Sequence, residues 1–289
     1  MSYDTGEKMT ESYTCGLCPH NCEIEPGNAG FCRARGVSSD GGINVIPLSY
    51  AKLSSIALDP IEKKPLKHFH PGSTILSVGS FGCNLKCPWC QNSNISMAGE
   101  GDVETHDVAP EALAQLAEQY VPEGNIGVAF TYNEPLISFE YVYDTSKILK
   151  SKGLKTVLVT NGYMNADYLE ILLPLIDAMN IDLKGIDRDF YKQIGGDLDT
   201  VQNNIRLAAA KCHVEITCLL INGVNDSKHE IERLTDFVAS VSPEIPLHIS
   251  RFFPHHHFKD KAPTRIETMK LFEEIASEKL KHVHLGNIR

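Results

Sequence analysis

Seven of the nine cysteines fall into two tight groups, which in an unsecreted chain indicates metal binding rather than disulfides. The first group, Cys83, Cys87 and Cys90, has the spacing C-x3-C-x2-C. A [4Fe–4S] cluster contains four irons and usually takes four thiolates. Three local thiolates would leave one iron without a protein ligand. Such an open position can bind a substrate, as it does at a catalytic zinc.

The alternative for this group is a structural zinc site completed by a distant cysteine or histidine. Zinc sites usually pair their cysteines as C-x2-C, so the C-x3-C spacing favours the cluster. Trp89, directly before the third cysteine, would be a core residue in a zinc site. We therefore predict an iron–sulfur cluster with one open iron in this loop.

The second group, Cys15, Cys18, Cys22 and Cys32, has the spacing C-x2-C-x3-C-x9-C. The surrounding segment contains Gly and Pro and has too few apolar residues to fold alone, so a bound metal would supply the missing stability. Four thiolates suit structural zinc and an auxiliary [4Fe–4S] cluster equally well. The closed coordination shell favours zinc, but the spacing leaves both metals open.

The elements that must position these cysteines are predicted from apolar runs and helical periodicity. Short, β-branched runs typical of buried parallel strands lie at residues 74–79, 126–130, 156–160, 178–183, 214–220, 247–250 and 282–285. Helical patterns alternate with them, at residues 110–121, 138–150, 165–173, 200–211, 227–241 and 264–278.

This alternation predicts an α/β fold, namely a partial (β/α)6 TIM-type barrel over residues 71–289. A small Cys-rich N-terminal metal-binding segment, residues 1–70, precedes it. Chemistry in parallel α/β folds lies at the carboxyl ends of the strands, and the first cysteine group follows the first strand. Cys212 and Cys218 flank an apolar stretch and are expected in the core.

Polar side chains follow several later strands, and we expect them beside the cysteine loop. They are Thr131, Asn133, Glu134, Thr160, Asn161, Asp182, Lys184 and His248. Asp182 and Lys184 are two residues apart and can point to the same side of a strand. The structural alternatives are a surface Glu in a turn, turn chemistry at Asn-Gly, an ion pair at a strand end and a core histidine.

The cysteine loop, with an aromatic residue before its third cysteine, resembles the radical SAM superfamily. Closer similarity is to the activase-like branch, which includes the pyruvate formate-lyase activating enzymes, and within it to the AmmeMemoRadiSam-system radical SAM proteins. The resemblance covers most of the chain. It rests on both cysteine groups and on residues 59–66, 130–135 and 249–252.

This resemblance implies that the open iron binds S-adenosylmethionine through its amino and carboxylate groups, and that one electron cleaves it to a 5′-deoxyadenosyl radical. It also implies that residues around Glu134 hold the methionine ammonium and that Lys184 meets the carboxylate. Trp89 would pack near the adenine, and His248 would reach the ribose or adenine.

The sequence is compatible with three functions. The leading hypothesis is an oxygen-sensitive enzyme that abstracts hydrogen from an unidentified substrate and takes electrons from flavodoxin or ferredoxin. A glycyl radical activase with a protein substrate is the alternative, although Tyr132 and Asn133 replace two glycines of the superfamily motif and Val159 replaces an acid that helps hold a cation in the activases. A non-catalytic zinc-binding scaffold is the third.

The amino-acid composition bears on the partners and the location that we expect for the protein. The net charge of −10 argues against nucleic acid, and 42% hydrophobic with 22% charged residues is ordinary for a globular protein. Apolar runs are too short to span a membrane. Residues 1–4 do not resemble the start of a secretory signal, so a cytoplasmic enzyme is expected.

Overall fold

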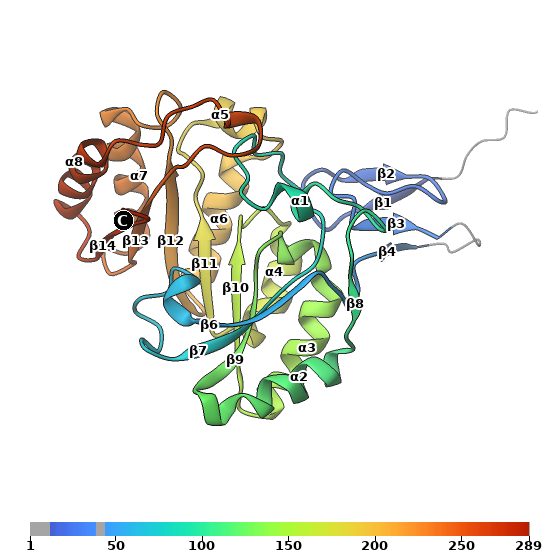
Figure 1. The fold of residues 1–289 in the computed structure, drawn as a ribbon. Helices are drawn as coiled ribbons and strands as arrows, with labels where there is room; N and C mark the ends of the chain where they lie inside the picture. Colours follow the sequence, from blue (N-terminus) through green and yellow to red (C-terminus); the bar gives the residue numbers. More distant parts are fainter. Residues whose placement is uncertain (1–11, 39–43, 289) are drawn as a thin grey trace, which may run out of the picture.

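The computed structural model describes residues 12–38 and 44–288, so residues 1–4 lie outside the described part. One eight-stranded sheet forms its centre, and helices cover the outer side (Figure 1). In spatial order the strands are β14 (Val283–Gly286), β13 (Leu247–Arg251), β12 (His213–Leu220), β11 (Ala178–Asp182), β10 (Lys155–Thr160), β9 (Asn125–Phe130), β7 (Thr74–Gly79) and β6 (Ser55–Pro60). All neighbours are parallel except β6 and β7.

Each predicted helix is present, with ends shifted by a few residues. The helices are α2 (Pro110–Gln119), α3 (Phe139–Ser151), α4 (Ala166–Leu172), α6 (Leu198–Ala209), α7 (Lys228–Val241) and α8 (Ile266–Ser277). Helix α6 begins earlier than predicted because Asp197 caps it, accepting a bond from the backbone N–H of Thr200 at 2.8 Å. The alternating order of strands and helices confirms the predicted α/β partial barrel.

Several elements escaped the prediction. They are the helices α1 (Ser93–Ser96) and α5 (Arg188–Gln193), the edge strand β6, and the short pairs β1 (Tyr13–Cys15) with β2 (Cys22–Ile24), β3 (Arg35–Val37) with β4 (Val45–Pro47), and β5 (Lys52–Leu53) with β8 (His106–Asp107). Strand β6 belongs to the proposed segment 1–70, yet it pairs with β7 along its whole length. The boundary near residue 70 stays a prediction.

Residues 61–70, the plug segment, close the amino end of the barrel. Ile61 and Leu66 pack against Ile75 of β7 and against small inward-facing residues of the next strands. The backbone N–H groups of Lys67 and His68 donate to the carboxylate of Glu215, which lies near the start of β12. The opposite end, where the strands finish, stays open for chemistry.

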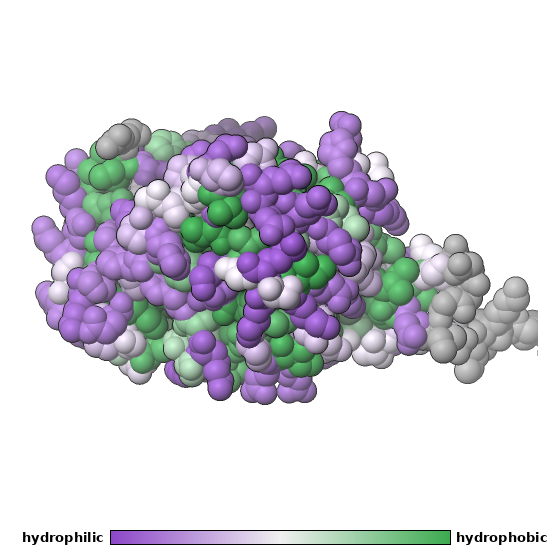
Figure 2. Space-filling model, turned by 90° about the horizontal axis from the view of Figure 1, so that it is seen from below, coloured by the Kyte–Doolittle hydropathy of each residue, from purple (hydrophilic) through white to green (hydrophobic). Residues whose placement is uncertain are grey.

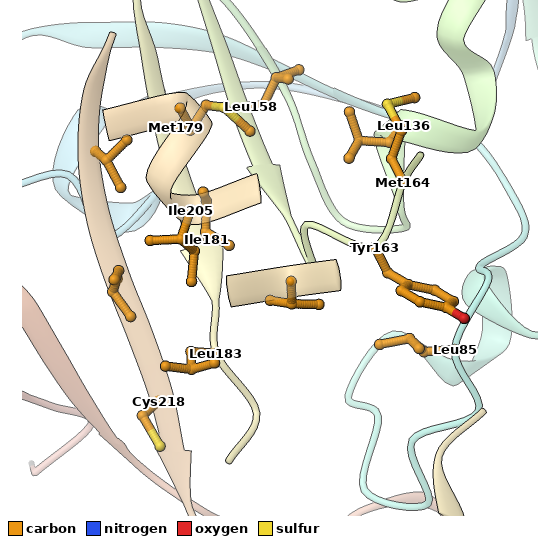
Figure 3. Packing of buried hydrophobic residues seen from close by; sticks show 14 of the residues in the cluster. Leu85, Leu136, Leu158, Tyr163, Met164, Met179, Ile181, Leu183, Ile205 and Cys218 are labelled. Carbon is orange, nitrogen blue, oxygen red and sulfur yellow. The ribbon is translucent and has the colours of Figure 1, made fainter. Parts of the chain in front are cut away.

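The main core lies between the sheet and the outer helices. Figure 3 shows Leu158, Met179, Ile181 and Cys218 on this side of the strands, with Ile205 of α6 packed over them. Each fully buried apolar side chain of this kind contributes about 1.5–3 kcal/mol. Cys218 is thus a core residue, as expected.

Hydrophilic and hydrophobic side chains are interspersed on the face seen in Figure 2. In residues 12–38 and 44–288, no helix has both the length and the apolar character needed to cross a bilayer.

Candidate active site and a second cysteine site

A cavity of about 340 Å³ lies at the carboxyl ends of the parallel strands. It brings together the first cysteine group and every predicted barrel residue except His248. These lining residues are Cys83, Cys87, Trp89, Cys90, Thr131, Asn133, Glu134, Thr160, Asn161, Asp182 and Lys184. The positions come from loops after four different strands, as expected for a site at this end of the sheet.

Hydrogen-bond donors surround the sulfur of Cys83. The backbone N–H of Leu85 donates to Cys83 Sγ over 3.4 Å, and Asn161 Nδ2 donates to the same atom over 3.7 Å. Cys90 Sγ lies 3.1 Å from Ser96 Oγ in helix α1. Donors directed at sulfur stabilise the thiolate, which is the form that binds metal.

Burial favours the protonated form of the Cys83 and Cys87 thiols. It raises the pKa of Cys83 well above the usual value, with Glu134 adding to the effect, and it raises the pKa of Cys87 to about 12 although Lys184 opposes the rise. In the described ranges, no three Cys, His, Asp or Glu side chains are grouped to hold a single metal ion. Three thiols spread around one cavity fit a multi-iron group, whose binding would displace their protons.

Glu134 is buried between the ends of β9 and β10 and ties these strands together. Its Oε1 accepts from Thr160 Oγ1 at 2.6 Å and from the N–H of Leu136 at 2.9 Å, while Oε2 accepts from the N–H of Asn161 at 2.8 Å. Burial raises the pKa of Glu134 to about 7 in spite of these donors. The carboxyl group therefore lacks a full positive partner and suits a cationic ligand.

Asn133 holds the loop that precedes Cys83. Its Oδ1 accepts from the N–H of Ser80 at 2.8 Å, and its Nδ2 donates to the carbonyls of Phe81 at 3.0 Å and Gly82 at 3.1 Å. Because the amide already contacts this backbone on both sides, the role that the structure supports for Asn133 is to position the cysteine loop.

Asp182 and Lys184 point into the cavity together, as their spacing predicted. Lys184 Nζ donates to Asp182 Oδ2 over 2.6 Å. Burial opposes the charged form of Lys184, but Asp182 and then Cys87 more than compensate, and the pKa of Lys184 is raised above its usual value. The cavity therefore contains a permanently charged ammonium near Cys87.

Trp89 lies at the cavity wall and also in the core. Its ring stacks on Phe190 with centroids 5.5 Å apart and an interplanar angle of 6°, and Phe258 lies 5.7 Å away. Trp89 is therefore a buried aromatic residue that also lines the cavity, and its contact with the adenine stays a prediction. Thr131 is buried and also lines the cavity.

His248 is placed elsewhere, deeper in the barrel. Its Nε2 lies 2.6 Å from Oε2 of Glu215, a fully buried carboxylate that also contacts His213 Nε2 at 2.9 Å. His248 is absent from the lining of the cavity at the carboxyl ends. Sequence alone could not separate the two positions, because Glu215 and the plug segment lie far from His248 in the chain.

The sequence did not predict a hydrogen-bonded group at the cavity that consists of Asp59, Lys64 and Tyr132. Tyr132 donates its hydroxyl to Asp59 Oδ2 over 2.8 Å, and Lys64 Nζ donates to the same oxygen over 2.8 Å. Tyr132 and Lys64 line the cavity. Two features of the sequence pointed to this group, namely the run at residues 59–66 and Tyr132 in place of a glycine of the superfamily motif. Tyr132 has a positive φ of 70°, a backbone conformation that is uncommon for residues other than glycine.

The second cysteine group also comes together. Cys15 and Cys22 are directly opposite each other across the β1–β2 pair, and Cys18 lies in the connecting turn. Cys32 is close enough to Cys15, Cys18 and Cys22 for the thiols to interact electrostatically. Burial raises the pKa of Cys18 to about 11.

Backbone donors support these sulfurs. The N–H of Phe31 donates to Cys22 Sγ over 3.4 Å, and backbone groups of His20 and Ala34 hydrogen-bond Cys18 and Cys32. Such N–H to sulfur bonds favour thiolates. Preformed donors to these sulfurs suit thiolates, although the four thiols are not grouped to hold a single metal ion.

Comparisons with known proteins agree with this geometry. The model of the radical SAM superfamily matches residues 77–238. The uncharacterized protein MJ0808 of Methanocaldococcus jannaschii is 37% identical over 98% of this chain and 84% of its own length. A pyruvate formate-lyase-activating enzyme from Clostridium pasteurianum is 28% identical over 55% of this chain and 67% of its own length.

A solved radical SAM methyltransferase from Sphaerobacter thermophilus shares the fold, with a TM-score of 0.57 and 16% identity over 75% of this chain and 67% of its own. The chain belongs to the radical SAM superfamily. Its resemblance to the activating enzymes, predicted from the motifs, is confirmed, and the superfamily implies a [4Fe–4S] cluster and S-adenosylmethionine.

Proposed function

We propose that Cys83, Cys87 and Cys90 hold a [4Fe–4S] cluster whose open iron binds S-adenosylmethionine, and that the protein uses this cofactor to abstract hydrogen from an unidentified substrate. A bound and reduced cluster would supply the one electron that breaks the sulfonium C–S bond of S-adenosylmethionine and releases a 5′-deoxyadenosyl radical. The observation that carries the proposal is one cavity combining these three thiols with groups for both charges of an amino acid.

The acidic and basic residues of the cavity would bind different groups of the methionine part of the cofactor. Glu134, whose carboxyl group lacks a full positive partner, would accept hydrogen bonds from the methionine amino group. Lys184 would meet the carboxylate, with Asp182 holding its ammonium in place. Thr160 and Asn161 orient Glu134 through their bonds to its two oxygens.

The remaining lining residues would shape the cofactor pocket. Trp89 offers an aromatic edge to the adenine, and Thr131 adds a buried hydroxyl at the wall. Asn133 would act through the loop backbone that it holds. His248 is left out of this set because its ring is engaged by Glu215.

An activase function is the second candidate. The similarity to pyruvate formate-lyase-activating enzymes favours it and suggests a protein substrate, with flavodoxin or ferredoxin as electron donor. Val159 and Tyr132, where the activase pattern differs, both line the cavity and would alter the surroundings of the cofactor. A glycyl radical signal on mixing with a candidate partner would separate the activase from an enzyme that acts on a small molecule.

The proposal is tested by incubating anaerobic, reduced protein with S-adenosylmethionine and measuring 5′-deoxyadenosine and methionine. Wild type should form both, and Cys87→Ala should form neither and lose most of the iron of one cluster. Cys212→Ser is the matched control, because Cys212 lies outside both cysteine groups. Cleavage retained by Cys87→Ala would refute the assignment of the cluster.

A further inference from the structure

The four-cysteine site lies directly against the loop that carries Cys83. Gly82 has a φ of +83°, and a Cβ at this position would lie 2.4 Å from the carbonyl oxygen of Cys32. His20, two residues after Cys18, donates through Nε2 to the carbonyl of Asn84 over 2.9 Å. The two cysteine groups are therefore in contact at both residues that flank Cys83.

The side chain of Asn84 bridges the two groups. Asn84 is 1% exposed, and its amide hydrogen-bonds the thiol of Cys18 and donates to the carbonyl of Tyr163 at 2.6 Å. Its Oδ1 accepts from Asn161 Nδ2 over 2.9 Å, and the same nitrogen donates to Cys83 Sγ over 3.7 Å. Two amides thus link the sulfur of Cys18 to the sulfur of Cys83.

One thiol of the four-cysteine site is accessible from outside. Cys22 is only partly buried, whereas Cys15, Cys18 and Cys32 are buried. In the first cysteine group, Cys87 is buried and Cys83 is partly buried, and both line the cavity at the carboxyl ends of the strands. The four-cysteine site therefore reaches from the surface, at Cys22, to the catalytic loop, at Cys18 and Asn84.

We propose that the four-cysteine site holds a second [4Fe–4S] cluster that receives electrons and passes them to the catalytic cluster through Asn84. This inference rests on the proposed function. One electron leaves a reduced flavodoxin or ferredoxin, reduces the second cluster, and then moves to the catalytic cluster, which returns the second cluster to its oxidised state. Zinc has no redox chemistry and could not take this place.

Metal analysis gives the first test. On anaerobically reconstituted wild type we expect about eight irons per chain, because each [4Fe–4S] cluster contributes four. Cys18→Ser should fall to about four irons, and the control Cys212→Ser should keep the wild-type number. Four irons with one zinc in the wild type would overturn the proposal and leave the catalytic cluster in place.

The second test uses Asn84→Leu, which keeps the side-chain size and removes the amide. Its iron content should match wild type, which verifies folding and loading. Stopped-flow absorbance should show slower reduction of the catalytic cluster by reduced flavodoxin in this variant and in Cys18→Ser. Reduction as fast as in wild type in both variants would overturn the relay.

The two proposals fail in different ways. Cleavage of S-adenosylmethionine driven by dithionite, a small reductant that reaches both clusters, should persist in Asn84→Leu. Loss of the flavodoxin-driven rate alone supports the relay. Absence of cleavage in wild type with dithionite would refute the catalytic assignment itself.

Discussion

At the scale of single residues, Glu134 is the clearest link between structure and chemistry. It joins two strand ends through three hydrogen bonds, and its burial leaves the carboxyl group half-ionised near neutral pH, since its pKa is about 7. An amino group bound to iron would donate its N–H hydrogens to Glu134, which would favour the carboxylate and lower this pKa. Binding of S-adenosylmethionine should therefore release a proton from Glu134.

This release makes cofactor affinity depend on pH. The dissociation constant of S-adenosylmethionine should fall as the pH rises through about 7, and level off once Glu134 is ionised in the free protein. Glu134→Gln should weaken binding by about 1.5–3 kcal/mol, roughly 10- to 150-fold, and abolish the pH dependence. Calorimetric titration of cluster-loaded protein measures both. An unchanged pH profile in the variant would exclude Glu134 as the partner of the amino group.

The sequence predicted those site residues that lie at or directly after the end of a strand. Glu134, Asp182 and Lys184 each come within a few residues of a strand end, so their convergence followed from the parallel order alone. Asn84 and Asp59 were not recognised, because their roles depend on partners more than 70 residues away in the chain, such as Asn161 and Tyr132. The run at residues 59–66 marks Asp59 as a position of interest, but it does not show which distant residue Asp59 contacts.

At the scale of elements, the loop between β7 and α1 is held by a side chain from the loop after β9. Asn133 contributes three bonds to residues 80–82, which lead into Cys83. The neighbouring strands β7 and β9 thus fix the cysteine loop as well as the sheet. The two glycines of the superfamily motif would lack these side-chain bonds.

Replacing Asn133 should loosen this loop. Asn133→Ala leaves one N–H and two carbonyls without their partner, so we expect a loss of about 1–3 kcal/mol in stability and less iron retained after desalting. Thermal unfolding and iron content measure the two effects. Asn203→Ala, on the exposed face of α6, is the matched control and should change neither. Full iron retention in Asn133→Ala would show that the loop holds its shape unaided.

At the scale of the whole molecule, the parallel barrel could be predicted because each strand and helix has a strong local pattern. Strand β6 and the plug segment could not, since Pro and charged residues interrupt the apolar residues of the run at residues 55–66. Their place depends on pairing with β7 and on filling the barrel end with Ile61 and Leu66. The predicted boundary near residue 70 therefore separates β6 and the plug segment from the strands that they contact.

Truncated chains test whether the barrel needs β6 and the plug segment. A chain of residues 71–289 would leave β7 as an unpaired edge and expose Ile75 at the emptied barrel end, so it should aggregate on size-exclusion chromatography. A chain of residues 52–289 keeps β6 and the plug segment and should be recovered to a greater extent as monodisperse protein. Equal recovery of both would support the boundary near residue 70.

The central claim is that the cluster at Cys83, Cys87 and Cys90 has an open iron that binds S-adenosylmethionine. Electron paramagnetic resonance of the reduced, anaerobic protein tests it directly. Adding S-adenosylmethionine should change the signal of the reduced cluster in wild type, and Cys87→Ala should lack the responsive signal. A cluster signal indifferent to S-adenosylmethionine, or zinc as the sole metal after reconstitution with iron and sulfide, would contradict the account.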